Sequence, residues 1–204
     1  MTKIKICGIT NAKDAKFAAE LGADYLGFNF YIKSPRHLFP STAKKIIGKI
    51  NGDAKIVGIF VNESIASIKK ISKSCGLDFI QLSGDEDEKF LHALKEKIKI
   101  PIIKSFRIKG KNAIHCRGTS KPDYILIDSY KKKQYGGTGQ TFDLRLAKKF
   151  DSKKLFLAGG LDSHNVKLAI AQISPYAVDV CSGIESSCGI KDHEKMKKFV
   201  EAAK

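Results

Sequence analysis

Short apolar runs recur along the chain, and each has the length and composition of a β-strand. In the run that opens the chain, apolar and polar residues alternate, as they do in strands. Most runs begin about 22 residues after the previous one, which leaves room for a strand, a short loop and a helix. Eight strands are predicted in this way, over Ile4–Ile9, Tyr25–Phe30, Ile56–Val61, Phe79–Gly84, Ile102–Ile108, Tyr124–Ser129, Leu155–Gly160 and Ala177–Gly183.

Helical patterns fill most of the intervals between these runs. Residues that cap helices precede apolar positions spaced three or four apart, which share one helix face. Only residues 109–121, which include two glycines, read poorly as a helix. The predicted caps and apolar positions are Ser41 before Ile46, Ile47 and Ile50, Asn62 before Ile65, Ile68 and Ile71, Asp85 before Phe90, Leu91, Leu94 and Ile98, Ser163 before Val166 and Ile170, and Asp192 before Met196, Phe199 and Val200.

The alternation of strands and helices predicts an α/β fold. Parallel strands joined by crossover helices give this order, and eight such units suggest a closed (β/α)8 barrel, the TIM barrel. The chain is short for a barrel, since about 250 residues is typical. We therefore expect one compact barrel domain over residues 1–204. A doubly wound open sheet is the alternative, although such sheets more often have fewer strands.

Two sequence features fit a barrel. A turn residue, an aspartate and an aromatic residue recur before alternate strands, in Gly22–Tyr25, Gly76–Phe79 and Lys121–Tyr124. Extra residues follow the second strand at 31–40 and the sixth at 130–141, with Arg36 in the first insertion and the cluster Gly136–Gly139 in the second. Both insertions connect a strand to a helix, on the face where barrel enzymes build their active sites.

Composition narrows the function classes. A net charge of +16 would suit a nucleic-acid-binding protein, but the lysines are dispersed rather than clustered with arginines or aromatic residues. We therefore expect the lysines to lie on solvated helix faces, where their charge attracts anionic small molecules, and we expect no nucleic-acid partner. The five cysteines are odd in number and lack a C-x-x-C pair, so neither a disulfide framework nor a zinc site is expected.

The chain is also expected to act in the cytoplasm. No stretch approaches the roughly 18 apolar residues of a membrane span, so no membrane partner is expected. The first residues lack the apolar run and cleavage site of a signal peptide.

Several reactive side chains fall at predicted strand ends. Cys7 comes directly before Gly8 at the exit of the first strand, with Lys5 on the same strand face. Asp128 follows four residues of apolar character, which places it at the barrel mouth, partly desolvated. Asp179 is a charge within the eighth strand and needs a partner or a function. Since the eighth strand neighbours the first in a closed barrel, we hypothesise that Asp179 pairs with Lys5.

Glycine-containing turns follow the last two predicted strands. Gly159 and Gly160 end the seventh strand, and Ser182 and Gly183 end the eighth. Barrels often bind phosphate in these loops through backbone N–H groups and a helix N-terminus. Together, a thiol, a carboxylate, an arginine and a phosphate cradle suit proton transfer on a phosphorylated, anionic substrate.

The chain resembles the phosphoribosylanthranilate isomerase family of tryptophan biosynthesis over nearly its whole length. The motifs that carry the resemblance are Lys5–Thr10, Gly27–Phe30, Ser34–Arg36, Val57–Val61, Gln81-Leu82, Gly136–Gly139, Thr141–Asp143, Leu157–Leu161, Asp179–Glu185 and Lys191-Asp192. The resemblance implies a (β/α)8 barrel that needs no metal or organic cofactor. It also implies an Amadori rearrangement of N-(5-phosphoribosyl)anthranilate, an aminoaldose phosphate, to an aminoketose phosphate.

The resemblance also assigns roles. Cys7 matches the family's general base and Asp128 its general acid, while Arg36 would hold the anthranilate carboxylate. Ser83 and Asp179 are expected in the substrate-binding site, and Gly159, Gly160, Ser182 and Gly183 would hold the phosphate. The chemistry requires a protonated Asp128 and an ionised Cys7 near neutral pH. Burial can raise the pKa of Asp128, and Lys5 can lower the pKa of Cys7.

Three positions depart from the family's pattern. Ser83 stands where a histidine is common, Cys181 where a serine is common, and Leu144 where a tryptophan is common. Ser83 bears on affinity or rate, and a related aminoaldose-phosphate isomerase with broader specificity is the alternative function. A pentose-phosphate epimerase is disfavoured, because neither metal ligands nor paired carboxylates are visible at strand ends. We expect a monomer or a homodimer.

Overall fold

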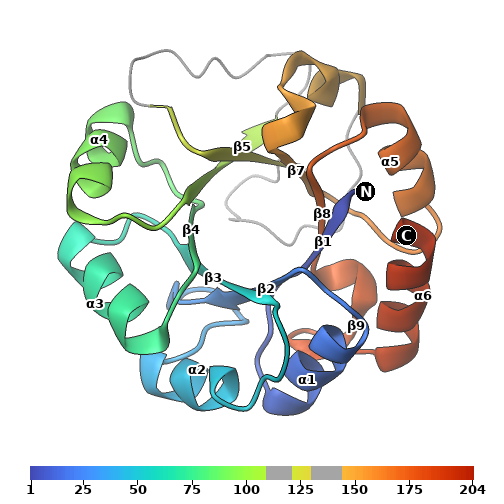
Figure 1. Cartoon of the computed structure of the whole chain (residues 1–204), viewed down its shortest axis with the longest axis horizontal. Helices are drawn as coiled ribbons and strands as arrows, with labels where there is room; N and C mark the ends of the chain where they lie inside the picture. Colours follow the sequence, from blue (N-terminus) through green and yellow to red (C-terminus); the bar gives the residue numbers. More distant parts are fainter. Residues whose placement is uncertain (109–120, 130–143) are drawn as a thin grey trace.

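Eight parallel strands close into a barrel in the computed structural model, which describes residues 1–108, 121–129 and 144–204 (Figure 1). Neighbouring strands follow chain order, and the last pairs with the first. The predicted (β/α)8 barrel is thus confirmed, and the open sheet is wrong. The strands are β1 (Lys3–Ile6), β2 (Tyr25–Asn29), β3 (Lys55–Phe60), β4 (Phe79–Leu82), β5 (Ile102–Ile108), β6 (Tyr124–Ser129), β7 (Leu155–Leu157) and β8 (Ala177–Val180).

Helices surround the ring of strands in Figure 1, and the larger apolar core lies between the two layers. A small hairpin of β9 (Glu185–Ser187) and β10 (Ile190–Lys191) follows β8. None of the helices in the described ranges is long and apolar enough to cross a membrane. The helices are α1 (Ala12–Glu20), α2 (Pro40–Ile47), α3 (Ile65–Cys75), α4 (Glu88–Lys97), α5 (Val166–Ile173) and α6 (His193–Ala203), with 3-10 turns at Leu144–Lys149, Ser152–Lys154 and Ser182–Ile184.

The predicted strands extend too far at several carboxyl ends. After β1, β7 and β8 the chain leaves the sheet about three residues earlier than the apolar runs suggest. The apolar pattern continues there because those residues remain packed as they form the rim of a pocket. The segment 109–120, which the sequence indicates is not helical, and the cluster Gly136–Gly139 lie outside the described residues.

Most of the predicted helix-capping residues are wrong. Ser64, rather than Asn62, accepts the N–H of Ser67 and caps α3. Asn62 instead has a left-handed backbone with φ of 50°, which asparagine tolerates, and its side chain accepts the N–H of Asp85. The Asn62 side chain therefore links the loop after β3 to the loop after β4 and does not cap α3.

Among the other predicted helices, only α6 begins at its predicted capping residue. Asp192 caps α6 as predicted, whereas Asp87 rather than Asp85 caps α4. Phe39 and Asn165 precede α2 and α5, without side-chain cap bonds. Helix α1, capped by Asn11, is absent from the predicted set.

The three aspartates of the repeat, Asp24, Asp78 and Asp123, each accept a hydrogen bond from the backbone of a preceding strand. The aromatic residue after each aspartate packs at the amino-terminal end of the barrel. The ring of Tyr25 lies edge-on to that of Phe79, and the ring of Tyr124 is tilted against it. The repeat therefore ties neighbouring strands together and fills the barrel floor. In each case the carboxylate accepts a backbone N–H from the preceding strand: Asp24 from Ile4, Asp78 from Ile56 and Asp123 from Ile102, at 2.8, 2.8 and 2.9 Å.

A buried ion pair joins β1 to β8 where the barrel closes. Lys5 Nζ lies 2.8 Å from Asp179 Oδ1, and the two residues are direct register partners. The hypothesised pair is therefore confirmed. Burial works to lower the pKa of Lys5, but the charges of Asp179 and Cys7 outweigh it and raise that pKa. Burial raises the pKa of Asp179 to about 7, even though Lys5 acts to lower it.

We expect Lys5→Met to lower the free energy of unfolding by about 3 kcal/mol, because it leaves the Asp179 carboxyl buried without its cation. The matched control is Lys55→Met, which removes the half-exposed partner of Asp78 and should cost less than about 1 kcal/mol. Urea unfolding of both variants measures the difference. Equal losses of unfolding free energy in the two variants would contradict the larger contribution expected of the buried pair.

Candidate active site

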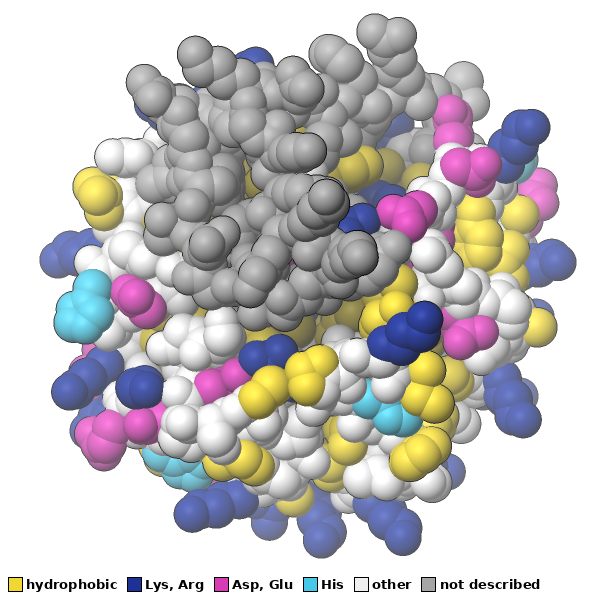
Figure 2. All heavy atoms as spheres, turned by 180° about the vertical axis from the view of Figure 1, so that it is seen from behind, with side chains coloured by type: hydrophobic (Ala, Val, Ile, Leu, Met, Phe, Trp, Pro, Cys, Tyr) yellow, Lys and Arg dark blue, Asp and Glu magenta, His cyan; other side chains and the backbone are white. Residues whose placement is uncertain are grey.

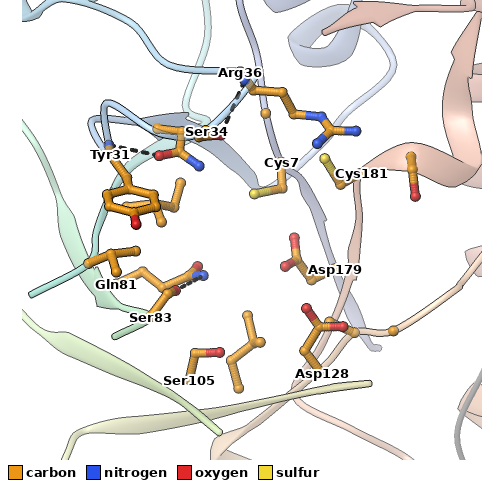
Figure 3. Close-up of a pocket in the computed structure, with 18 of the residues that line it drawn as sticks. Cys7, Tyr31, Ser34, Arg36, Gln81, Ser83, Ser105, Asp128, Asp179 and Cys181 are labelled. Carbon is orange, nitrogen blue, oxygen red and sulfur yellow. Dashed lines mark hydrogen bonds between the residues drawn. The ribbon is translucent and has the colours of Figure 1, made fainter. Parts of the chain in front are cut away.

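A pocket of about 380 Å³ opens at the carboxyl ends of the strands, the face on which barrel enzymes act (Figure 3). All the site residues predicted from the sequence line it, although their chemical roles stay predictions. Further polar side chains in the lining come from β2, β4 and β5 and from the loops after β2 and β8. The predicted residues in the lining are Cys7, Arg36, Ser83, Asp128, Gly159, Gly160, Asp179, Ser182 and Gly183.

The pleat of the strands brings these side chains together. Residues two apart on a strand point to the same face, so Asp128 shares the barrel interior with Leu126. Gln81 and Ser83 are related in the same way, as are Asp179 and Cys181. In Figure 3, Gln81 and Ser83 lie across the pocket from the two aspartates.

Cys7 directly follows β1 and is held against β8. Its backbone N–H donates to the carbonyl of Val180 at 2.8 Å. The next residue, Gly8, has a φ of 71°, and a Cβ there would collide with the side chains of Arg36 and Cys181. Glycine is therefore required on both counts, and it turns the chain away so that the thiol faces the pocket.

The surroundings of Cys7 favour its thiolate form. A hydrogen bond with the Cys181 thiol is the largest influence and lowers the pKa of Cys7. Burial opposes it, but the nearby ammonium groups of Lys5 and Lys191 lower the pKa further, to well below the usual value for a thiol. The same hydrogen bond raises the pKa of Cys181 well above its ordinary value, so Cys181 stays protonated.

Asp128, the last residue but one of β6, lies on the same side of the pocket as Asp179 (Figure 3). Its side chain is only 7% exposed, which makes it a desolvated carboxyl at the barrel mouth. Its charge adds to the influences that raise the pKa of Asp179, so the two carboxyls are electrostatic neighbours. Cys7, which follows β1, and Asp128, on β6, thus line one cavity.

Arg36 is buried in the loop after β2 and forms a two-pronged ion pair with Glu185. Nε and Nη2 lie 2.7 and 2.5 Å from the two carboxylate oxygens. Lys191 Nζ donates to the same carboxylate at 3.0 Å. The hydrogen bond with Glu185 is the largest influence that raises the pKa of Arg36, so the guanidinium remains charged.

Glu185 stays ionised between these two cations. Burial alone would raise the pKa of Glu185, but the hydrogen bond from Arg36 and the charge of Lys191 lower it overall. Neither Glu185 nor Lys191 is singled out as a site residue by the sequence pattern. Their only signal is membership of the two motifs that close the resemblance, because the hairpin carrying them has no regular period.

Ser83, which directly follows β4, lies at the pocket wall as expected and accepts a hydrogen bond from Gln81 on that strand. Gln81 Nε2 donates to Ser83 Oγ at 3.0 Å. The other end of this amide, Oε1, is buried and has no hydrogen-bond partner among the described residues. This wall therefore presents a fixed hydroxyl and an amide group to a ligand.

The loops after β7 and β8 lie against each other. Gly159 and Gly160 have φ of 94° and 68°, in the left-handed region that favours glycine. A Cβ on Gly183 would collide with the carbonyl of Leu161, so this glycine is needed for the close approach. The predicted phosphate-binding glycines thus form one continuous rim of the pocket. Within the described part of the chain, no group of three metal-ligating side chains is assembled.

The fold and the pocket define a (β/α)8-barrel protein with acid–base groups at the catalytic end of the barrel. A family model described as N-(5'phosphoribosyl)anthranilate (PRA) isomerase matches residues 4–202. The N-(5'-phosphoribosyl)anthranilate isomerase of Bacillus mycoides is 43% identical over 205 residues, covering 99% of this chain and 98% of its own. The chain belongs to the phosphoribosylanthranilate isomerase family, which comprises isomerases of tryptophan biosynthesis.

Solved structures agree with this assignment. The phosphoribosyl anthranilate isomerase of Thermus thermophilus matches with a TM-score of 0.87 at 28% identity, covering 98% of both chains. Another, in complex with reduced 1-(o-carboxyphenylamino)-1-deoxyribulose 5-phosphate, matches with a TM-score of 0.82 at 33% identity, covering 100% of this chain and 98% of its own.

The lowered pKa of Cys7 predicts its reactivity. Iodoacetamide should alkylate Cys7 with a half-maximal rate at a pH well below 8.5, the usual pKa of a free thiol, because only the thiolate reacts. The exposed Cys188 is an internal control in the same molecule and should follow the ordinary thiol range. Mass spectrometry of the modified peptides measures both rates. Coincident pH profiles for the two thiols would contradict the electrostatic account of the pocket.

Proposed function

We propose that this pocket carries out the family's isomerisation of N-(5'-phosphoribosyl)anthranilate, with Cys7 as general base and Asp128 as general acid. The observation that supports the proposal most strongly is that Cys7, at the exit of β1, lines one cavity with the buried carboxyl of Asp128, while the Cys181 thiol, Lys5 and Lys191 lower the pKa of Cys7. A family that performs acid–base chemistry on a phosphorylated, carboxylate-bearing substrate matches such a pocket.

The reaction begins with two proton transfers, one from Asp128 and one to Cys7, and ends with a tautomerisation. Asp128 gives a proton to the ribose ring oxygen, the C1′–O bond breaks, and the nitrogen lone pair forms an iminium at C1′. Cys7 thiolate then takes the C2′ proton, and the electrons of that bond give an enolamine. Protonation of C1′ and loss of the C2′ hydroxyl proton give the ketone, so no net proton is consumed.

The remaining pocket residues hold the substrate in this proposal. Arg36 binds the anthranilate carboxylate, because its guanidinium has more N–H donors than its two bonds to Glu185 use. The glycine rim of Gly159, Gly160, Ser182 and Gly183 binds the phosphate. Ser83 and Asp179 contact the rest of the substrate, and no cofactor takes part.

The wider setting is also part of the proposal. We propose one domain over residues 1–204, acting in the cytoplasm as a monomer or homodimer, with a phosphorylated small molecule as its only ligand. A related isomerase from Thermotoga maritima is described as dimeric. On the face seen in Figure 2, basic side chains of the described residues are interspersed with acidic ones, which suits dispersed solvation better than nucleic-acid binding.

Two substitutions test the acid–base assignment. Cys7→Ala and Asp128→Asn should each lower kcat by about 100-fold or more, the usual weight of a positioned acid or base. Substrate can be formed from anthranilate and phosphoribosyl pyrophosphate with a coupling transferase, and its fluorescence loss followed. Cys188→Ala and Asp151→Asn, both outside the pocket, are the matched controls. Near-normal kcat in either pocket variant would remove that residue from the mechanism.

Gly183→Ala tests the phosphate rim. The added Cβ pushes the β8 loop away from Leu161, so the KM for substrate should rise roughly tenfold while kcat changes little, as expected when a hydrogen bond to a charged group is lost. Inorganic phosphate should also inhibit the variant less than the parent. Gly48→Ala, at the end of α2 with an ordinary helical backbone, controls for the substitution itself. An unchanged KM would place the phosphate elsewhere.

A further inference from the structure

The hairpin that follows β8 inserts two charged side chains behind the pocket. Glu185, on β9, and Lys191, on β10, are 9% and 4% exposed. Lys191 Nζ contacts the Glu185 carboxylate at 3.0 Å and the carbonyl of Cys181 at 3.1 Å. The backbone N–H of Lys191 donates to the buried carboxylate of Asp14 on α1, which fixes the strand that carries it.

A lone Arg36–Glu185 pair would be poorly suited to bind a substrate carboxylate. Both carboxylate oxygens of Glu185 are bonded to the guanidinium, so the pair by itself is neutral. A second carboxylate that approached Arg36 would meet the first one, and like charges at such distances repel strongly in a desolvated site. A further cation is needed at the shared carboxylate, and Lys191 is the residue placed there.

The balance of the buried charges around the Arg36–Glu185 pair supports this requirement. Three buried cations, Lys5, Arg36 and Lys191, lie among the carboxyls of Asp179 and Glu185 and the thiol of Cys7, whose pKa is lowered. The proposed mechanism keeps Asp128 protonated. Removing Lys191 would take one positive charge from this group, beside a pocket that must admit both a carboxylate and a phosphate.

We propose that Lys191 and Glu185 are positioning residues for substrate specificity: Glu185 fixes the guanidinium of Arg36, and Lys191 neutralises Glu185 so that Arg36 can bind the carboxylate of the substrate's aromatic ring. The inference rests on the proposed role of Arg36. It assigns a function to the hairpin, which supplies no group to the proton transfers themselves.

The test compares two substrates that differ only in the carboxylate. N-(5-phosphoribosyl)anthranilate and N-(5-phosphoribosyl)aniline are prepared by condensing ribose 5-phosphate with anthranilate or with aniline. The ratio of their kcat/KM values is measured by chromatography of the ketose products. Because Lys191 also lowers the pKa of Cys7, its removal slows both reactions, and the ratio cancels this common effect.

The native chain should prefer the anthranilate substrate, and Lys191→Met should reduce that preference by about tenfold or more, the weight of a unit charge several ångströms away at a protein-like dielectric. Lys191→Arg restores the cation and should recover most of the preference. Lys195→Met is the matched control, since Lys195 donates to the backbone carbonyl of Glu185 and not to its carboxylate. Its preference should equal that of the native chain.

The outcomes separate this inference from the function on which it rests. No turnover of either substrate by the native chain would overturn the proposed function. Turnover without any preference for the carboxylate would overturn the role of Arg36 and, with it, this inference. A native preference that Lys191→Met retains in full would overturn the role of Lys191 alone.

Discussion

The ion pair between Lys5 and Asp179 is the constraint on which both the barrel and its pocket depend. Closing eight parallel strands brings the first and last side by side, and these two residues are register partners at that seam. A buried charge pair is costly when misaligned, so it disfavours a register shift that an apolar seam would tolerate. With the register fixed, Cys7 and Cys181, each two residues further along, lie next to each other at the mouth.

The same pair then sets the chemistry of the site. Lys5 supplies positive charge to Cys7 from within its own strand, and the Cys181 thiol supplies a hydrogen bond from the neighbouring strand. A second cation, Lys191, acts from the hairpin behind the pocket. One residue therefore serves both the barrel and the pocket, because Lys5, which pairs across the closing seam, also lowers the pKa of Cys7.

Much of this arrangement could be predicted from the sequence, for identifiable reasons. The eight strands follow from apolar runs at a regular spacing, and the Lys5–Asp179 pair follows from barrel closure applied to two buried charges. The reactive residues Cys7 and Asp128 were visible because each interrupts or ends an apolar run. The repeat at Asp24, Asp78 and Asp123 is also evident in the sequence, but only the folded barrel shows that each aspartate accepts a backbone N–H from a preceding strand.

Other features depend on contacts that no local pattern encodes. Glu185 and Lys191 are aligned by a short hairpin without periodicity, and their partner Arg36 lies 149 residues from Glu185 along the chain. Ser64 rather than Asn62 caps α3, although serine and asparagine are equally good capping residues, because the side chain of Asn62 accepts the N–H of Asp85 in the next loop. The hydrogen bond between Cys7 and Cys181 likewise exists only after the first and last strands meet.

The most direct test of this account is a pH titration of thiolate absorbance near 240 nm, taken as the difference between the native chain and Cys7→Ser, and repeated in the Lys5→Met background. The account predicts that Cys7 ionises well below the ordinary thiol range in the native chain and that its pKa rises clearly when Lys5 is replaced. Ionisation at the same pH in both backgrounds would contradict the claim that the charge closing the barrel also activates the thiol.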